Sequence, residues 1–250
     1  MIEFFKTILY EPLLNLLVIF YNFPGHDLGV AIVILTIVIK LIFIPLSIKS
    51  NRAQKSLRDI QPKLDEIKKK YPDQKEKQAK ATMNLYKENK INPASSCLPL
   101  LVQLPVLIVV YQVFRVGLTS SSLPIYSFIQ DPGTLNLVAF GFLKLAEPNL
   151  ILAVITAVLQ YLQVNVFSSK KPSRVLAKQG VAKDENMMTI MNSQMKYMMP
   201  ILTIFIGATL PSGLMLYWLV SLLFSLVEQK IIFGYSKKIE VKKYEPKSNN

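Results

Sequence analysis

Long apolar runs separated by highly charged stretches form the main pattern along the chain. A helix needs about 20 apolar residues to cross a bilayer. Five stretches come near this length and predict membrane-spanning helices: residues 28–50, 98–117, 149–168, 195–210 and 212–229. Pro211, Ser212 and Gly213 separate the last two, so these form an antiparallel hairpin with a tight turn. The pattern predicts an all-α membrane protein with five transmembrane helices.

The stretch 51–92 between the first two predicted spans is charged and carries only a narrow apolar stripe. The apolar residues of its first half follow a helical spacing of 3, 4, 3, 4: Leu57, Ile60, Leu64, Ile67 and Tyr71. Pro62 predicts a kink or a helix start within this half. A second helix is expected from about Gln74 to Glu88, and Ala79, Met83 and Tyr86 are expected to share one of its faces. Together they predict a mobile helical hairpin with little core of its own.

Residues 1–24 are rich in aromatic side chains and could be read as a signal peptide or as a retained helix. Glu3 lies where a signal peptide carries positive charge, and no small-x-small cleavage site follows. We therefore expect an amphipathic interfacial helix on the outer leaflet. It leads into the first span after the break at residues 23–25.

The net charge of +13 is distributed unevenly among the connecting segments. Residues 49–90 hold thirteen basic and six acidic side chains, and residues 170–196 hold six and two. Residues 115–148 and the turn 211–213 carry no net charge, and the tail from Glu228 is again basic. The positive-inside rule then places the N-terminus outside, the C-terminus in the cytoplasm, and the hairpin 51–92 on the cytoplasmic side. The same basic excess suits contact with anionic lipids.

Catalytic and cofactor chemistry finds no support in the motifs of the chain. The single Cys97 and the single His26 exclude a disulfide framework and a Cys/His metal cluster. The chain lacks the glycine-rich nucleotide-binding patterns and the H-E-x-x-H zinc pattern. We therefore expect no enzyme activity, no cofactor, no metal and no nucleotide.

Lys40 is the most unusual residue of the chain, because it lies in the middle of the first apolar run. A charge at the bilayer centre costs about 2.5–3.5 kcal/mol on insertion scales. No acidic residue lies between Leu28 and Ser50 to offset it. Lys40 must therefore either extend to the interface or face a wet cavity. Its position at mid-span makes the interface hard to reach and favours the cavity.

Four segments resemble the YidC family of membrane protein insertases in their order and spacing. They are Thr36 to Leu46 around Lys40, Gln61-Pro62-Lys63 with Leu85-Tyr86-Lys87, Asn92 to Pro105, and Met199-Pro200 followed by Pro211 to Tyr217. The resemblance covers about residues 10–234. It implies a five-helix core around a hydrophilic groove that opens to the cytoplasm and to lipid. It also implies a bacterial cell membrane protein that inserts nascent membrane proteins and helps them fold.

The resemblance divides the chain into an interfacial helix at 1–24, an insertase core at 25–234 and a basic tail at 235–250. It implies that Lys40 is the cation of the groove, although relatives usually carry Arg there. Thr36 lies one turn earlier on the same helix face. Its hydroxyl could line the groove or bond to a carbonyl of its own helix, and the sequence favours neither role. Gln103, Gln160 and Tyr217 are the other expected groove residues, and for the amides interhelical bonding is an equal alternative.

Two further features concern partners. Six of the nine methionines lie from Met187 to Met199. They could form an adaptable apolar surface along which varied substrate helices move, or they could be ordinary core residues. The basic tail suits lipid surfaces, and in this family such tails contact ribosomes, so ribosome and Sec translocon are candidate partners. Two other functions remain: a secondary transporter for a small anion, and an assembly scaffold. A transporter of this kind usually shows internal repeats, and the sequence shows none. It would also need carboxylates within the membrane, but the central parts of the predicted spans contain no Asp or Glu.

Overall fold

A computed structural model describes residues 6–23, 25–72, 74–92, 103–112, 124–167 and 197–235 of the 250-residue chain. Its elements are η1 (Lys6–Tyr10), α2 (Glu11–Asn22), α3 (Leu28–Asp59), α4 (Gln61–Lys70), α5 (Lys75–Glu88), β1 (Val138–Ala139), β2 (Leu143–Lys144), α7 (Leu150–Phe167), α9 (Met199–Thr209) and α10 (Ser212–Tyr235). A further helix spans Gln103–Gln112. The regular secondary structure of the described part is therefore helical apart from one antiparallel pair of two-residue strands, and residues 124–149 are otherwise turns and loops.

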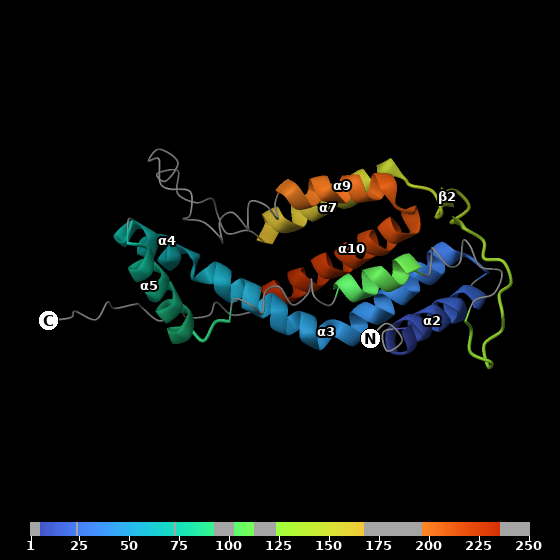
Figure 1. Cartoon of the computed structure of the whole chain (residues 1–250), viewed down its shortest axis with the longest axis horizontal. Coiled ribbons are helices and arrows are strands. Elements are labelled where there is room, and N and C mark those ends of the chain that lie inside the picture. Colours follow the sequence, from blue (N-terminus) through green and yellow to red (C-terminus); the bar gives the residue numbers. More distant parts are fainter. Residues whose placement is uncertain are drawn as a thin grey trace.

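α7 and α9 pack side by side, and α10 runs between this pair and α3 (Figure 1). α2 packs along the other side of α3. The helices α4 and α5 form one end of the molecule, which we call the hairpin end. Residues 124–148, with β1 and β2, form the opposite loop end.

Two helices begin at polar side chains that cap them. Asp27 accepts hydrogen bonds from the backbone N–H groups of Gly29 and Val30, at 2.7 and 3.1 Å, and so caps α3. Asn149 accepts one from the Leu152 N–H at 3.0 Å and caps α7. Apolar segments long enough to cross a bilayer begin at Leu28 and at Ser212. The helix 103–112, α7 and α9 are apolar but shorter in the described residues.

The structure moves several predicted boundaries. The helix of the first predicted span continues past Ser50 to Asp59, because no proline or glycine lies between Ser50 and Pro62. Pro62 lies in the first turn of α4, where its missing N–H breaks no helical hydrogen bond. The helix therefore ends before Ile60, and a new helix begins at Gln61. The last helix, expected to end at Gln229, extends to Tyr235. The predicted start of the fourth span at Met195 lies outside the described residues.

The hairpin end has a small core of its own, made of Leu57, Ile60, Leu64, Ile67, Ala81 and Leu85. The apolar stripe predicted for its first helix is therefore confirmed. The face predicted for α5 is wrong at two of its three residues: Ala79 and Met83 are exposed, whereas Tyr86 packs against this core. Ala81 and Leu85 turn inward instead. Ala81 and Leu85 are four residues apart and so share a face, whereas Met83, two residues away from each, points to the other side.

The N-terminal helix α2 contributes to the main core rather than lying apart from it. Leu14, Leu17, Val18 and Tyr21 are almost fully buried, and α2 packs on α3. The described aromatic residues of this region differ in exposure: Tyr10 and Tyr21 are buried, while Phe23 is 92% exposed. The apolar face of this amphipathic helix is thus largely covered by protein.

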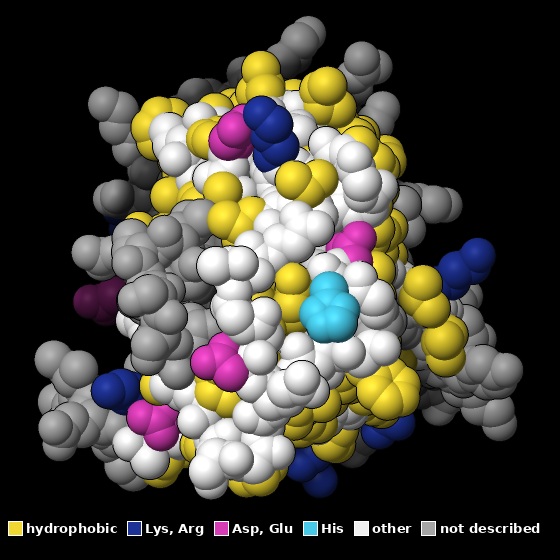
Figure 2. Space-filling view, turned by 90° about the vertical axis from the view of Figure 1, so that its right-hand side faces the viewer, with side chains coloured by type: hydrophobic (Ala, Val, Ile, Leu, Met, Phe, Trp, Pro, Cys, Tyr) yellow, Lys and Arg dark blue, Asp and Glu magenta, His cyan; other side chains and the backbone are white. Residues whose placement is uncertain are grey.

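The loop end is tied together by side chains that bond to the backbone. Asn15 donates to Glu11 O at 2.8 Å and to Pro124 O at 3.3 Å, and accepts from Tyr126 N at 2.8 Å. Asp27 accepts from Phe140 N at 2.6 Å, and Ser212 donates to Lys144 O at 2.7 Å. Basic and acidic side chains are scattered over this end and do not gather in one patch (Figure 2). These bonds close the bundle at the loop end.

Candidate functional site

A pocket with polar and apolar walls lies between α3, α10 and the helix 103–112. We call it the Lys40 pocket. It is lined by Ile39, Lys40, Phe43, Leu46, Ser47, Ser50, Gln103, Val106 and Tyr217. Three of the residues expected at the site therefore line it together: Lys40, Gln103 and Tyr217. They come from three different helices, so no single stretch of sequence builds the pocket.

Lys40 is half-buried and turned toward the last helix. Its Nζ donates a hydrogen bond to Ser225 Oγ on α10 at 3.2 Å. The next residues on α3, Leu41 and Ile42, are 51% and 65% exposed. The helix thus presents apolar side chains outward at this level and directs its amine into the bundle.

Gln103 and Tyr217 form the floor of the pocket. The Gln103 Nε2 donates to the Tyr217 hydroxyl at 2.7 Å, and Ser221 donates to Gln103 Oε1 at 3.4 Å. Tyr217 is only 2% exposed. Ser225 in turn donates to the backbone oxygen of Ser221 at 2.9 Å. A chain of polar groups therefore runs along α10 from the Tyr217 hydroxyl to the Lys40 ammonium.

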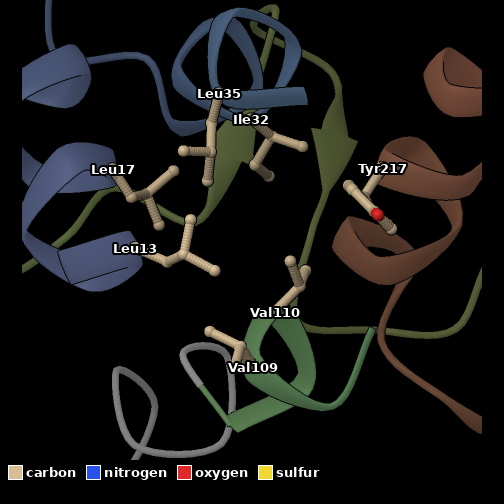
Figure 3. Close-up of a pocket in the computed structure, with 7 residues that line it drawn as sticks. All are labelled: Leu13, Leu17, Ile32, Leu35, Val109, Val110 and Tyr217. Carbon is tan, nitrogen blue, oxygen red and sulfur yellow. The ribbon is translucent and has the colours of Figure 1, made fainter. Parts of the chain in front are cut away.

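Tyr217 also borders a second, apolar pocket toward the loop end. Leu13 and Leu17 of α2, Ile32 and Leu35 of α3, and Val109 and Val110 turn toward this space (Figure 3). No charged side chain is among its lining residues. Because Tyr217 lines both pockets, its ring separates the polar space around Lys40 from the apolar packing behind it.

The structure places two other expected site residues elsewhere. Thr36 is fully buried and donates to Ile32 O on its own helix at 2.6 Å, which is the backbone-bonding alternative. Gln160 on α7 accepts a hydrogen bond from Thr203 on α9 at 2.6 Å, so it joins these two helices. Neither residue lines the Lys40 pocket. Of the methionine cluster, Met187, Met188, Met191 and Met195 lie outside the described residues.

Sequence reasoning missed the polar residues that connect α3 and α10 beyond Lys40. Ser47 donates to Glu228 Oε2 at 2.6 Å, and Gln229 donates to Asn51 at 3.4 Å. Lys40, Ser47 and Asn51 recur at seven and four residues, which is one face of a helix. Ser221, Ser225 and Gln229 repeat every four residues on α10. This periodicity of small polar residues was the available signal.

The fold and this pocket are those of a helical protein with an apolar exterior and a cation among its packed helices. A model of the 60Kd inner membrane protein family matches residues 19–239, which is most of the chain. The chain therefore belongs to this family, the YidC family that the four motifs indicated, and it is a membrane protein.

Individual relatives agree with this assignment. The chain is 34% identical over 208 residues to "Membrane protein insertase YidC" of Fusobacterium nucleatum, covering 82% of this chain and 86% of the relative. It is 30% identical over 226 residues to the protein of the same name from Geobacter metallireducens, covering 90% of this chain but only 37% of that longer relative.

A solved structure supports the fold. The crystal structure described as "Active YidC insertase crystal structure with the first transmembrane domain resolved" is 27% identical to this chain. The two superpose with a TM-score of 0.58, over 92% of this chain and 47% of that one. The helical fold described above is thus that of a YidC protein.

Proposed function

We propose that this chain is a membrane protein insertase that moves hydrophobic segments of nascent proteins into the bilayer and helps them fold there. The names of its relatives support this function. The observation that carries the proposal is the orientation of Lys40, whose amine is directed at Ser225 inside an apolar bundle, in one pocket with Gln103 and Tyr217.

In the proposed mechanism the Lys40 pocket is part of a hydrophilic groove that receives the polar flank of an incoming segment. Lys40 and the Gln103 amide replace part of the hydration of that flank and lower the cost of placing it at mid-membrane depth. The apolar segment leaves sideways into lipid, and its burial drives the step. The membrane potential adds about 2.3 kcal/mol per charge per 100 mV for acidic flanks that move outward. The mechanism needs no covalent step, cofactor or nucleotide.

The proposed topology has five spans, with the N-terminus outside and the C-terminus in the cytoplasm of a bacterial cell. Residues 1–24 form the outer interfacial helix, residues 25–234 the insertase core, and residues 235–250 the basic cytoplasmic tail. The hairpin α4–α5 then lies in the cytoplasm, where its small separate core lets it move as a unit and guide substrates. The bonds that close the loop end suit the sealed outer side of such a groove.

The proposed substrates are nascent membrane proteins. Ribosomes, the Sec translocon and anionic lipids are proposed partners through the basic hairpin and tail. Phosphate groups of RNA and of lipid headgroups both attract clustered lysines, so the two interactions share one electrostatic cause.

Reconstitution tests the function. Purified protein in liposomes is expected to increase the insertion of a short single-span protein over empty liposomes, measured by protease protection. Liposomes that show no such increase would contradict the proposal. The transporter alternative predicts uptake of a small anion without substrate protein, and the scaffold alternative predicts binding of the substrate without its insertion.

A further inference from the structure

Glu228 is a carboxylate on α10 close to the Lys40 pocket. Its Oε2 accepts a hydrogen bond from Ser47 Oγ, one of the residues that line the pocket, at 2.6 Å. Ser47 lies two helical turns beyond Lys40 on the same face of α3, and Glu228 lies one turn beyond Ser225 on α10. Two consecutive bonds therefore join the same two helices: Lys40 to Ser225, and Ser47 to Glu228.

Glu228 and the partner of Lys40 occupy neighbouring turns of α10. In the described part of the chain, Lys40 and Glu228 are each bonded to a serine of the facing helix rather than to each other. Charges in partly buried surroundings interact over several ångströms, because the effective dielectric constant is far below that of water. Glu228 must therefore reduce the positive potential that Lys40 creates in the pocket.

The negative charge of Glu228 is not required by its hydrogen bond. A glutamine oxygen would accept the same bond from Ser47. Within the described part of the chain, the second carboxylate oxygen, Oε1, is buried and has no hydrogen-bond partner. A buried carboxylate oxygen without a donor is unfavourable for folding. The fold thus carries a charge at this position whose local bonding a neutral residue could reproduce.

We propose that Glu228 sets the charge selectivity of the Lys40 pocket. By opposing the field of Lys40, it weakens the attraction for acidic flanks and admits substrates whose polar flank is neutral or basic. The proposal rests on the insertase function and goes beyond it, because it assigns substrate preference to a second residue with the opposite sign. Lys40 then provides the attraction and Glu228 limits it.

The test compares two single-span substrates that differ only in the translocated flank, one with two aspartates and one with two lysines. Initial insertion rates into liposomes of one lipid composition give the ratio of acidic to basic substrate. For Glu228→Gln we expect this ratio to rise roughly threefold, and more at low salt than at high salt. For Lys40→Met we expect it to fall. The ratio for the double variant Lys40→Met/Glu228→Gln should lie between the ratios of the two single variants.

Two control variants separate the charge effect from others. Glu228→Asp keeps the charge and should keep the wild-type ratio. Glu147→Gln makes the same change of net charge at the loop end, where Glu147 pairs with Lys144 on the exposed surface, and should leave the ratio unchanged.

The proposal is overturned if Glu228→Gln leaves the ratio unchanged, or if both substrates slow down equally, since that pattern belongs to a purely structural role. Failure of the insertase function looks different, because wild-type protein would then insert neither substrate.

Discussion

The Gln103 side chain donates a hydrogen bond to the Tyr217 hydroxyl at 2.7 Å, and this contact joins the helix 103–112 to α10 at the floor of the Lys40 pocket. It connects residues 114 positions apart in the sequence. On one side lie Lys40 and the serines of α10, and on the other lies the apolar pocket behind the Tyr217 ring. A single polar contact thus marks the boundary between the polar and the apolar parts of the bundle.

Removing either partner of this contact should destabilise the protein. Tyr217→Phe leaves the Gln103 amide without its acceptor, and Gln103→Leu leaves the tyrosine hydroxyl without its donor. In a double-mutant cycle with Tyr217→Phe/Gln103→Leu, we expect a coupling energy of about 0.5–1.5 kcal/mol. Reversible unfolding in mixed micelles measures it. A coupling near zero would show that the bond does not stabilise the packed helices.

Lys40 should be required for its charge rather than for its shape. Lys40→Met keeps an unbranched side chain but removes the charge, and we expect insertion of a substrate with an acidic flank to slow roughly tenfold, which corresponds to about 1.4 kcal/mol. Lys40→Arg keeps the charge under any burial and should retain activity. Protease protection in liposomes gives both rates. Equal rates for Lys40→Met and wild type would remove the specific role of this residue.

Asn15 should contribute strongly to closing the loop end. It is 2% exposed, and Asn15→Leu removes all three of its bonds to the backbone, leaving Tyr126 N without its acceptor. We expect a loss of about 2–3 kcal/mol in the free energy of unfolding. Asn22→Leu is the matched control, because Asn22 is shown donating a single bond, to Gln130 O at 2.8 Å. It should cost clearly less, and equal losses would argue against a special role of Asn15.

Gly207 should be needed for the close approach of α7 and α9. A Cβ at this position would lie 2.5 Å from the Ala153 Cβ, so Gly207→Ala forces the two helices apart and should cost about 1–3 kcal/mol. Ala153→Gly removes the opposing methyl group. The double variant Gly207→Ala/Ala153→Gly should therefore be more stable than Gly207→Ala alone, as measured by thermal unfolding in detergent. Absence of this rescue would mean that the contact does not limit the helix distance.

The hairpin core can be tested by a pair of substitutions on α5. Leu85 is fully buried and Met83 is 54% exposed. Leu85→Ala should destabilise the hairpin by about 2–4 kcal/mol, whereas Met83→Ala should change it by less than about 0.5 kcal/mol. Amide hydrogen exchange of residues 57–91 in the full-length protein measures both. The reverse order would restore the helix face that the sequence pattern suggested.

The helices were predictable because their causes are local. An apolar run of sufficient length predicts a span, and Pro62 and Pro211 mark breaks between helices. The face of α5 was not predictable in the same way. Its sequence offers two weak apolar stripes, and only packing against α4 selects the one with Ala81 and Leu85.

The sequence by itself determined the helical class, the family and the unusual position of Lys40, because a charge in an apolar run is costly wherever the helix packs. Only the tertiary structure decided which polar residues share a site with it. Thr36 bonds to the Ile32 carbonyl, and Gln160 bonds to Thr203. Lys40 instead bonds to Ser225, 185 positions away, and Ser47 bonds to Glu228. The physical reason is that the rotation of α3 against α10 about their axes selects the facing side chains, and this rotation is set by packing over the whole bundle.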